Sequence, residues 1–168
     1  MKKEKIKDIE IRNMCEADMF YLKNWLMDPV VLGWFPMTNA MEVEDALKNW
    51  QVYARLGSAF TAEVDGKPAG AINLYITPFE KIKHQSLFAI LVGEEYRGRG
   101  VGTKLLEFLM KVAKEKFGIT LLHLEVYEGN PAYNLYKRLG FKEYGVHKKF
   151  LKELDGTYHS KVLMQKEL

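Results

Sequence analysis

A glycine-rich turn lies between two strongly patterned segments and constrains the fold more than any other feature of this sequence. The apolar residues 84–92 predict a strand, and the amphipathic residues 103–117 predict a helix. Between them, Gly98, Gly100 and Gly102 occupy every second position, where the lack of side chains lets backbone amides approach an anion closely. The N-terminus of the following helix adds partial positive charge. The turn is therefore predicted to bind phosphate groups.

Positive side chains accompany this turn. Arg97, Arg99 and Lys104 place three full charges within or beside it. The whole chain has 25 Lys and Arg residues against 22 Asp and Glu residues, a net charge of +3. That excess is too small and too dispersed to indicate a nucleic-acid partner, but it suits a small polyanionic ligand if it gathers here. The competing interpretation is a plain tight turn with surface arginines.

Two common phosphate-binding motifs do not fit the turn. A P-loop requires a lysine after its second glycine, whereas Arg99 follows Gly98 here. The dinucleotide-binding fingerprint requires Gly or Ala three residues after its second glycine, and that position is Thr103. The preceding predicted strand also follows hairpins and does not open a strand–helix–strand unit. The turn is thus a phosphate-binding candidate of another kind.

The remaining patterns mix strands, helices and hairpins. Asp65-Gly66 and Asp155-Gly156 are turn signals between apolar segments. Asn39 followed by Glu42 is a helix-start signature. Strands are expected over residues 6–11, 60–64, 69–76, 84–92, 119–127, 141–151 and 158–164, helices over 16–26, 39–54, 103–117 and 131–139, and an apolar loop over 30–37. This mixture predicts an α/β (α+β) fold around a mixed sheet.

The length and amino-acid composition of the chain limit the class of protein to which it can belong. Residues 1–168 are predicted to form a single domain. Cys15 is the one cysteine, which excludes an intrachain disulfide and fits a reducing compartment. No stretch has the roughly 20 apolar residues of a membrane span, and no apolar region follows the charged residues 1–5 as in a signal peptide. The 4 histidines share no close spacing, so no metal is expected. We expect a cytoplasmic protein without a membrane partner.

Two blocks of sequence carry a family resemblance. The first is the Arg-x-x-Gly-x-Gly segment at residues 97–102, between a predicted strand and a predicted helix. The second runs from Leu-Glu-Val-Tyr at 124–127 through Gly-Asn-Pro-Ala at 129–132 to Leu-Tyr-Lys-Arg-Leu-Gly-Phe at 135–141. Ile11-Arg12, Asp18 and the late Asp-Gly-x-Tyr at 155–158 followed by Met164 agree with it. Together they resemble the GNAT N-acyltransferase superfamily, in particular its ribosomal-protein N-acetyltransferase-like and polyamine acetyltransferase branches. The clear resemblance covers about residues 84–141.

The resemblance implies a fold and a donor substrate. The sheet would be mixed and mostly antiparallel, with flanking helices and a splayed strand pair, and the donor would be acetyl-CoA. Residues 89–92 would diverge from residues 119–127, and the pantetheine arm would lie between them, bonded by the backbone near Leu91 and Val92. The amides of the turn would hold the pyrophosphate; these are the amides of Arg97, Gly98, Arg99, Gly100, Val101, Gly102 and Thr103.

The resemblance also implies a general base. An alkylammonium with a pKa of about 10.4 is neutral in only about one molecule in a thousand at pH 7, so a base assists acylation. Glu125 occupies the place of the base in the ribosomal-protein acetyltransferases, and its strand phase turns it away from the apolar face. The alternative for Glu125 is a solvated strand carboxylate. The strand before the turn carries no carboxylate, so the other candidates are His123, on the same side of the strand, and a water relayed by backbone carbonyls.

Tyr136 matches the family's general-acid tyrosine. A phenol has a pKa of about 10 against about 8.5 for a thiol, so full proton transfer to the leaving thiolate is uphill by roughly 2 kcal/mol. Tyr136 is therefore expected to act mainly by hydrogen bonding to the sulfur, the alternative being simple packing at a helix end. The family asparagine often lies seven residues before this tyrosine, at Gly129 here. Asn130, six residues before it, is expected either to contact the pantetheine or to cap the helix.

Three functional hypotheses follow. The first is an acetyl-CoA-dependent N-acetyltransferase that acts by direct transfer on a protein N-terminus, an amino acid or a small amine. The second is a non-catalytic CoA-binding regulatory module, and the third is a nucleotide-binding protein. Residues 30–37, the helix after them and residues 77–83 are expected to select the acceptor, with Trp34 and Phe35 as walls of the pocket. The chain is expected to be a monomer or a homodimer.

Overall fold

The computed structural model describes residues 3–168; Met1 and Lys2, part of the charged N-terminal stretch, lie outside the described residues. Its strands and helices mix as the sequence predicts, which confirms the α/β class. In chain order they are β1 (Glu10–Asn13), α1 (Asp18–Met27), α2 (Pro29–Leu32), α3 (Ala40–Arg55), β2 (Ala59–Val64), β3 (Lys67–Leu74), β4 (Gln85–Val92), the 3-10 helix η1 (Glu94–Tyr96), α4 (Val101–Phe117), β5 (Leu121–Tyr127), α5 (Ala132–Arg138), β6 (Lys142–Lys152) and β7 (Tyr158–Glu167).

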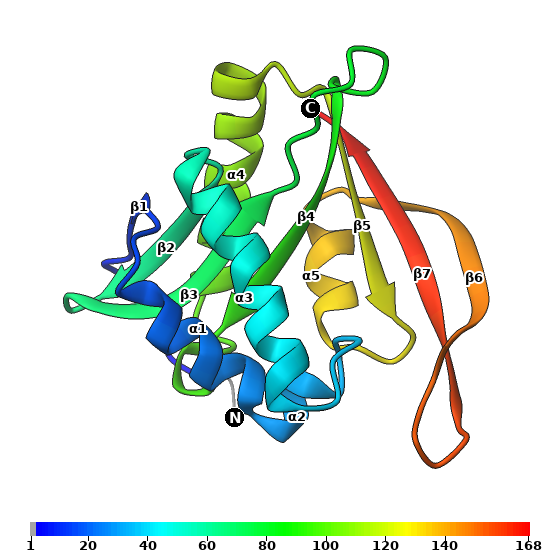
Figure 1. Ribbon diagram of the computed structural model, residues 1–168. Coiled ribbons are helices and arrows are strands. Elements are labelled where there is room, and N and C mark those ends of the chain that lie inside the picture. Colours follow the sequence, from blue (N-terminus) through cyan, green and yellow to red (C-terminus); the bar gives the residue numbers. More distant parts are fainter. Residues whose placement is uncertain (1–2) are drawn as a thin grey trace.

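The strands of the described chain form one 7-stranded sheet in the order β1-β2-β3-β4-β5-β7-β6. Every neighbouring pair is antiparallel except β4 and β5, which are parallel. This parallel pairing is short, from Gln85 opposite Leu121 to Leu87 opposite His123. Beyond it β4 continues alongside β3 and β5 continues alongside β7, and the two strands diverge with α5 behind the opening (Figure 1). The mostly antiparallel sheet and its splayed strand pair are thus confirmed.

Helices cover both faces of the sheet (Figure 1). On one face, α4 and α5 pack over a core that includes the fully buried Leu105 and Leu122. On the other face, α1 and α3 pack over a second core that includes Leu22 and Val43. Strands β3 and β4 contribute to both cores, and the β6–β7 hairpin extends beyond the helices. The backbones of β4 and β5 therefore separate between the two layers.

Two segments differ from the sequence-based expectation. The first strand, expected over residues 6–11, is found at Glu10–Asn13, and Ile6 before it donates its N–H to the carbonyl of Arg99 in the glycine turn at 3.0 Å. Residues 30–37 are not all loop, because α2 begins at Pro29 and the Asp28 Oδ1 atom accepts a hydrogen bond from the Val30 N–H at 2.9 Å. Among the helices within residues 3–168, none has the length and apolar character needed to cross a membrane.

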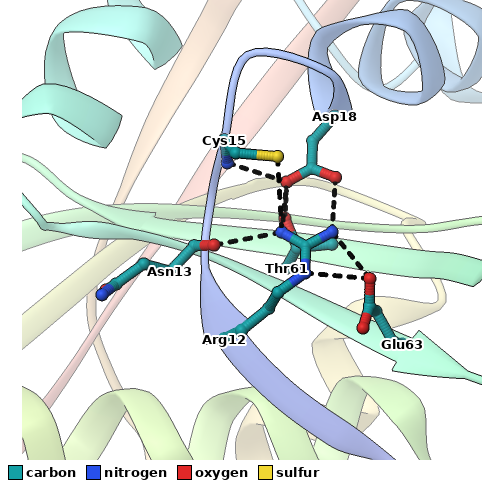
Figure 2. Close-up of polar contacts among 6 residues, drawn as sticks. All are labelled: Arg12, Asn13, Cys15, Asp18, Thr61 and Glu63. Carbon is teal, nitrogen blue, oxygen red and sulfur yellow. Dashed lines mark hydrogen bonds and ion pairs between the residues drawn. The ribbon is translucent and has the colours of Figure 1, made fainter. Parts of the chain in front are cut away.

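A polar network ties β1, α1 and β2 together (Figure 2). The Asp18 side chain is buried, and its two oxygens accept hydrogen bonds from Arg12 Nη1 and Nη2 at 2.7 and 2.8 Å. Thr61 Oγ1 and the Cys15 N–H also donate to it, at 2.8 and 2.9 Å, while Glu63 pairs with Arg12 from the other side. Burial alone would raise the pKa of Asp18, but hydrogen bonds, first from Arg12 and then from the other two donors, hold this pKa below its ordinary value. The network fixes where α1 begins.

Candidate active site

The edge of β4 faces the gap that opens between β4 and β5. The strand register pairs Leu91 with Ala71 of β3. Two residues further along, the Gly93 N–H donates a hydrogen bond to the Ala69 carbonyl of β3 at 2.9 Å. Because bonded and outward-facing residues alternate in an antiparallel ladder, the Leu91 backbone faces β3 while those of Ile90 and Val92 face the gap. The backbone groups of β4 that face the gap here are therefore those of Ile90 and Val92. Binding of a pantetheine arm by the backbone near Leu91 and Val92 stays a prediction.

The glycine turn needs glycine for its backbone conformation. Gly98 and Gly100 have φ values of 74° and 102°, in the region that L side chains rarely adopt, although an added Cβ at either would meet nothing within 4 Å. Helix α4 begins at Val101, two residues before the predicted start, and the Lys104 N–H closes its first turn on the Gly100 carbonyl at 3.0 Å. The amides before Lys104 point out of the helix N-terminus without a helical acceptor. These are the amides of Val101, Gly102 and Thr103.

The third glycine of the motif lies inside α4 and has a packing role. A Cβ at Gly102 would come within 3.2 Å of Leu135 Cδ2 on α5 and 3.7 Å of Val92 Cγ2 on β4. This close approach seats α5 against the start of α4, next to the gap. The spacing of the glycines predicts a turn, but this role depends on a helix that comes later in the chain.

The three positive side chains near the turn have different partners. Arg97 Nε donates to the Val92 carbonyl at 2.9 Å, and Arg97 Nη2 lies 3.4 Å from Asp28 Oδ2. The Arg97 guanidinium therefore joins the end of β4 to the corner between α1 and α2. Arg99 Nε donates to a backbone carbonyl of the N-terminal segment at 3.3 Å. Within residues 3–168, Arg99 and Lys104 have no ion-pair partner, so they bring uncompensated charge to the turn.

Tyr136 lies on the α5 side of the point where the strands diverge. Its ring contacts Phe88, the first β4 residue beyond the pairing with β5, with centroids 6.1 Å apart, and it also contacts Phe141 at 6.1 Å. Tyr136 is 7% exposed, and burial raises the pKa of its phenol well above the ordinary value of 10.0. The phenol is thus neutral at physiological pH and is a weaker acid than a free tyrosine. This favours a hydrogen-bonding role over complete proton transfer.

Glu125 and His123 lie on the opposite face of β5. Leu122 and Leu124, between and beside them, are buried in the core with α4, so strand alternation turns Glu125 and His123 toward the α3 side. His123 is the last β5 residue paired with β4, and Glu125 lies two residues beyond it, where the gap opens. Burial lowers the pKa of His123, against the raising effect of Glu125, so the imidazole is neutral at pH 7.

The Glu125 carboxylate is held by a partner from the next strand. Glu125 forms an ion pair with Lys161 of β7, and the side chains of the two residues are 38% and 14% exposed. Lys161 Nζ lies 3.6 Å from the ring centroid of Phe150 and 5.9 Å from that of Tyr127. Burial, with smaller contributions from Glu153 and Glu125, raises the pKa of Tyr127 to about 12. Burial, with smaller contributions from Tyr53 and Glu125, also raises the pKa of Tyr75. The charge of Glu125 therefore acts on a surrounding group of aromatic residues.

Sequence reasoning missed these aromatic residues. Tyr53 of α3 stacks on Tyr75, the residue after β3, with centroids 5.0 Å apart and the rings 10° from parallel. The Tyr127 hydroxyl is buried and has no hydrogen-bond partner in the described part of the chain. Tyr127 lies two residues after Glu125, so strand alternation is a signal that identifies it. Tyr53, Tyr75 and Lys161 come from other elements and have no such local signal.

Asn130 precedes α5, close to the gap. Asn130 Oδ1 accepts a hydrogen bond at 2.9 Å from the N–H of Ala132, the first residue of α5, which is compatible with the expected capping role. Contact between Asn130 and a pantetheine arm stays a prediction. No group of three or more His, Cys, Asp or Glu side chains within residues 3–168 is placed to hold a metal ion. A hollow of about 410 Å³ between α1 and α3, lined by Met19 and Glu44 among others, contains none of the candidate residues.

A family model and several known protein sequences match the chain. A model of the acetyltransferase (GNAT) family matches residues 19–141. The N-alpha-acetyltransferase of Sulfurisphaera tokodaii is 39% identical over 109 residues, which cover 59% of this chain and 65% of that protein. The chain thus spans slightly less than two thirds of that relative. The spermidine N(1)-acetyltransferase of Escherichia coli (strain K12) is 27% identical over 167 residues, which cover 93% of this chain and 84% of that protein.

The fold is also similar to a solved structure. The crystal structure of ribosomal-protein-alanine N-acetyltransferase from Brucella melitensis superposes with a TM-score of 0.81 at 28% sequence identity. The superposition covers 95% of this chain and 99% of the other. It therefore extends past residue 141, where the family match ends, into the β6–β7 hairpin.

Proposed function

Because the chain belongs to the acetyltransferase (GNAT) family, we propose that it transfers the acetyl group of acetyl-CoA directly to a primary amine. The observation that carries this proposal is the convergence of donor-binding and catalytic groups on one gap. Tyr136 contacts Phe88, the first β4 residue that is not paired with β5. Glu125 lies on the other face, two residues past the last β5 residue that is paired with β4. Tyr136 and Glu125 thus lie on opposite faces of the sheet where β4 and β5 diverge. This arrangement suits a reaction between a donor bound in the gap and an acceptor that enters from the α3 side.

The donor side of the gap matches the chemistry of coenzyme A. A pantetheine arm has amide groups that can pair with the outward-facing backbone of Ile90 and Val92, in the manner of an added strand. The pyrophosphate suits the first-turn amides of α4, because a helix N-terminus with unpaired amides favours anions. Arg99 and Lys104 supply positive charge beside these amides, whereas the side chain of Arg97 is held by Val92 and Asp28.

The catalytic groups divide the proton transfers between the two faces. Glu125 accepts a proton from the acceptor ammonium on the α3 side, and the neutral His123 beside it is the second candidate for this role. Tyr136 donates a hydrogen bond to the sulfur as negative charge develops there. Because the acceptor and the donor approach from different sides of the sheet, no covalent enzyme intermediate is needed.

The acceptor side is aromatic and carries a carboxylate. Tyr75 and Tyr127 lie close enough for the charge of Glu125 to act on them, and Tyr53 stacks on Tyr75. Aromatic faces with a carboxylate bind cationic amines. The similarity to proteins named N-alpha-acetyltransferase and ribosomal-protein-alanine N-acetyltransferase supports a peptide N-terminus as the acceptor. The similarity to a spermidine N(1)-acetyltransferase supports a small amine. We favour the peptide, because residues 30–37 are uncharged and apolar and so offer no negative charge to a polycation.

The test is release of coenzyme A thiol from acetyl-CoA across a panel of amines. The panel contains short peptides with a free N-terminus, the same peptides with a blocked N-terminus, free amino acids and spermidine. We expect saturable release with the free peptides and background release with the blocked ones. Binding of acetyl-CoA with no release above background for any amine would favour the non-catalytic alternative, which no observation in the described structure supports. Displacement of coenzyme A by ATP would favour a nucleotide-binding protein.

Replacing Arg99 with Met should weaken coenzyme A binding about fivefold, because one half-buried charge beside the phosphates is lost. The Kd is measured by calorimetry at low and high salt, and the salt dependence should be smaller in the variant because a screened attraction is missing. Lys111→Met removes the same charge from an exposed position further along α4 and should leave the Kd unchanged. Equal weakening by both variants would show that only the overall charge of the chain matters.

A further inference from the structure

Lys161 occupies the place next to the proposed base that an acceptor amine needs. Its Nζ atom is ion-paired with Glu125 and lies over the Phe150 ring, with the Tyr127 ring on another side. A carboxylate flanked by aromatic faces is a binding site for an alkylammonium group. The chain therefore presents a primary amine of its own to this site.

We propose that Lys161 is an acceptor and that the protein acetylates its own Lys161 Nζ atom. The proposal rests on the proposed function, because it uses the same donor and the same base. In the β5–β7 ladder Lys161 is directly opposite Tyr127, and directly opposite residues project on the same face. Tyr127 and Glu125 are two residues apart on β5 and share that face. The amine thus lies on the α3 side of the sheet, where the acceptor is proposed to enter.

The reaction at Lys161 balances without any further reactant. A bond forms between Nζ and the acetyl carbonyl carbon, and the carbon–sulfur bond of the thioester breaks. The ammonium loses two protons: Glu125 accepts the first and later releases it to solvent, and the second ends on the departing sulfur, to which Tyr136 donates a hydrogen bond. The products are acetylated Lys161, coenzyme A thiol and one proton.

If solvent exposure alone decided which lysine is acetylated, a lysine other than Lys161 would react first. Lys48 is also ion-paired with a carboxylate, that of Asp45, but its side chain is 72% exposed against 14% for Lys161. Uncatalysed acetylation by acetyl-CoA in solution requires access to the amine and therefore favours Lys48. Preferential acetylation of Lys161 requires the geometry of the site. Lys48 is thus a matched internal control.

The test incubates the full chain with acetyl-CoA and no other amine, then measures intact mass and maps acetylated peptides. We expect Lys161 to be acetylated at least about tenfold faster than Lys48, and Glu125→Gln to slow Lys161 about 100-fold without changing Lys48. Lys161→Arg, which keeps a positive charge for Glu125, should abolish the rapid gain of one acetyl group. Lys48→Arg should retain that gain.

Two results would overturn the proposal: acetylation of Lys161 no faster than that of Lys48, or an unchanged Lys161 rate in Glu125→Gln. Thiol release with external amines in the same preparation separates this failure from that of the proposed function. If external amines are acetylated while Lys161 stays unmodified, only the self-acetylation is wrong. If neither is acetylated although acetyl-CoA binds, the proposed function fails and the self-acetylation fails with it.

Discussion

Replacing Tyr136 with Phe should lower kcat by about 100-fold while leaving the Kd of coenzyme A unchanged. The substitution removes only the hydroxyl, so the ring keeps its contacts with Phe88 and Phe141 and the fold is preserved. The effect falls on kcat because the hydrogen bond to the sulfur strengthens only as the thiolate forms. Steady-state thiol release and calorimetric binding measure the two quantities.

The same helix offers a matched control for Tyr136. Tyr133 is one turn earlier on α5, and its hydroxyl bonds to Glu143 at the surface. Tyr133→Phe removes the same atom outside the gap and should leave kcat unchanged. Because burial raises the pKa of Tyr136 above 10.0, its hydroxyl also stays protonated through the alkaline range, and it should cause no fall in kcat up to pH 9. An undiminished kcat in Tyr136→Phe would exclude the tyrosine from the reaction.

Replacing Asp18 with Asn should lower the free energy of unfolding by about 2 to 3 kcal/mol, one of the largest single-residue effects expected in this chain. The substitution removes a buried carboxylate that accepts hydrogen bonds from Arg12, Thr61 and the Cys15 N–H (Figure 2). The expected cost is below that of a fully buried pair, because the Arg12 side chain is 35% exposed and also pairs with Glu63. Urea unfolding measures the difference. Asp45→Asn, in an exposed ion pair with Lys48, should cost much less.

The contribution of Asp18 should depend on pH with a defined sign. Its pKa is lower in the folded state than the ordinary value of 3.8, so the unfolded chain takes up the proton more readily as the pH falls. The stabilisation is therefore complete above the unfolded pKa and disappears as the pH falls through the folded pKa. The difference between the wild type and Asp18→Asn should be largest at neutral pH and shrink below about pH 4. A difference that stays constant down to pH 2 would contradict this origin.

The backbone structure of the predicted donor-binding segment could be anticipated from sequence because its signals are local. The strand, the turn and the amphipathic helix follow one another within residues 84–117, and the left-handed φ values of Gly98 and Gly100 match what alternating glycines indicate. The start of α4 was misplaced by two residues, because Gly102 is helical and serves the contact with Leu135. Which backbone groups of β4 face the gap could not be predicted, because the hydrogen-bonding side of a strand depends on its register with a neighbour.

The partners of the positive side chains near the turn could not be predicted from sequence. Arg97 and Arg99 are equivalent in sequence, two cations in one glycine-rich segment. In the folded chain, Asp28 reaches Arg97 from the corner between α1 and α2, while Arg99 contacts only backbone of the N-terminal segment. Distant parts of the chain therefore decide that the Arg97 side chain is ion-paired, and phosphate binding by either arginine stays a prediction.

The sequence by itself determined the fold class and the glycine turn, and it nominated Tyr136 and Glu125 as site residues, because hydrophobic periodicity, glycine conformation and motif spacing are properties of neighbouring residues. Only the tertiary structure decided what surrounds Glu125. Tyr53, Tyr75 and Lys161 come from α3, the end of β3 and β7, and they meet because the sheet order places β5 beside β7 and α3 over the same face. Ion pairing and burial depend on distances through space, and these distances exist only once the strands have paired and the helices have packed on them.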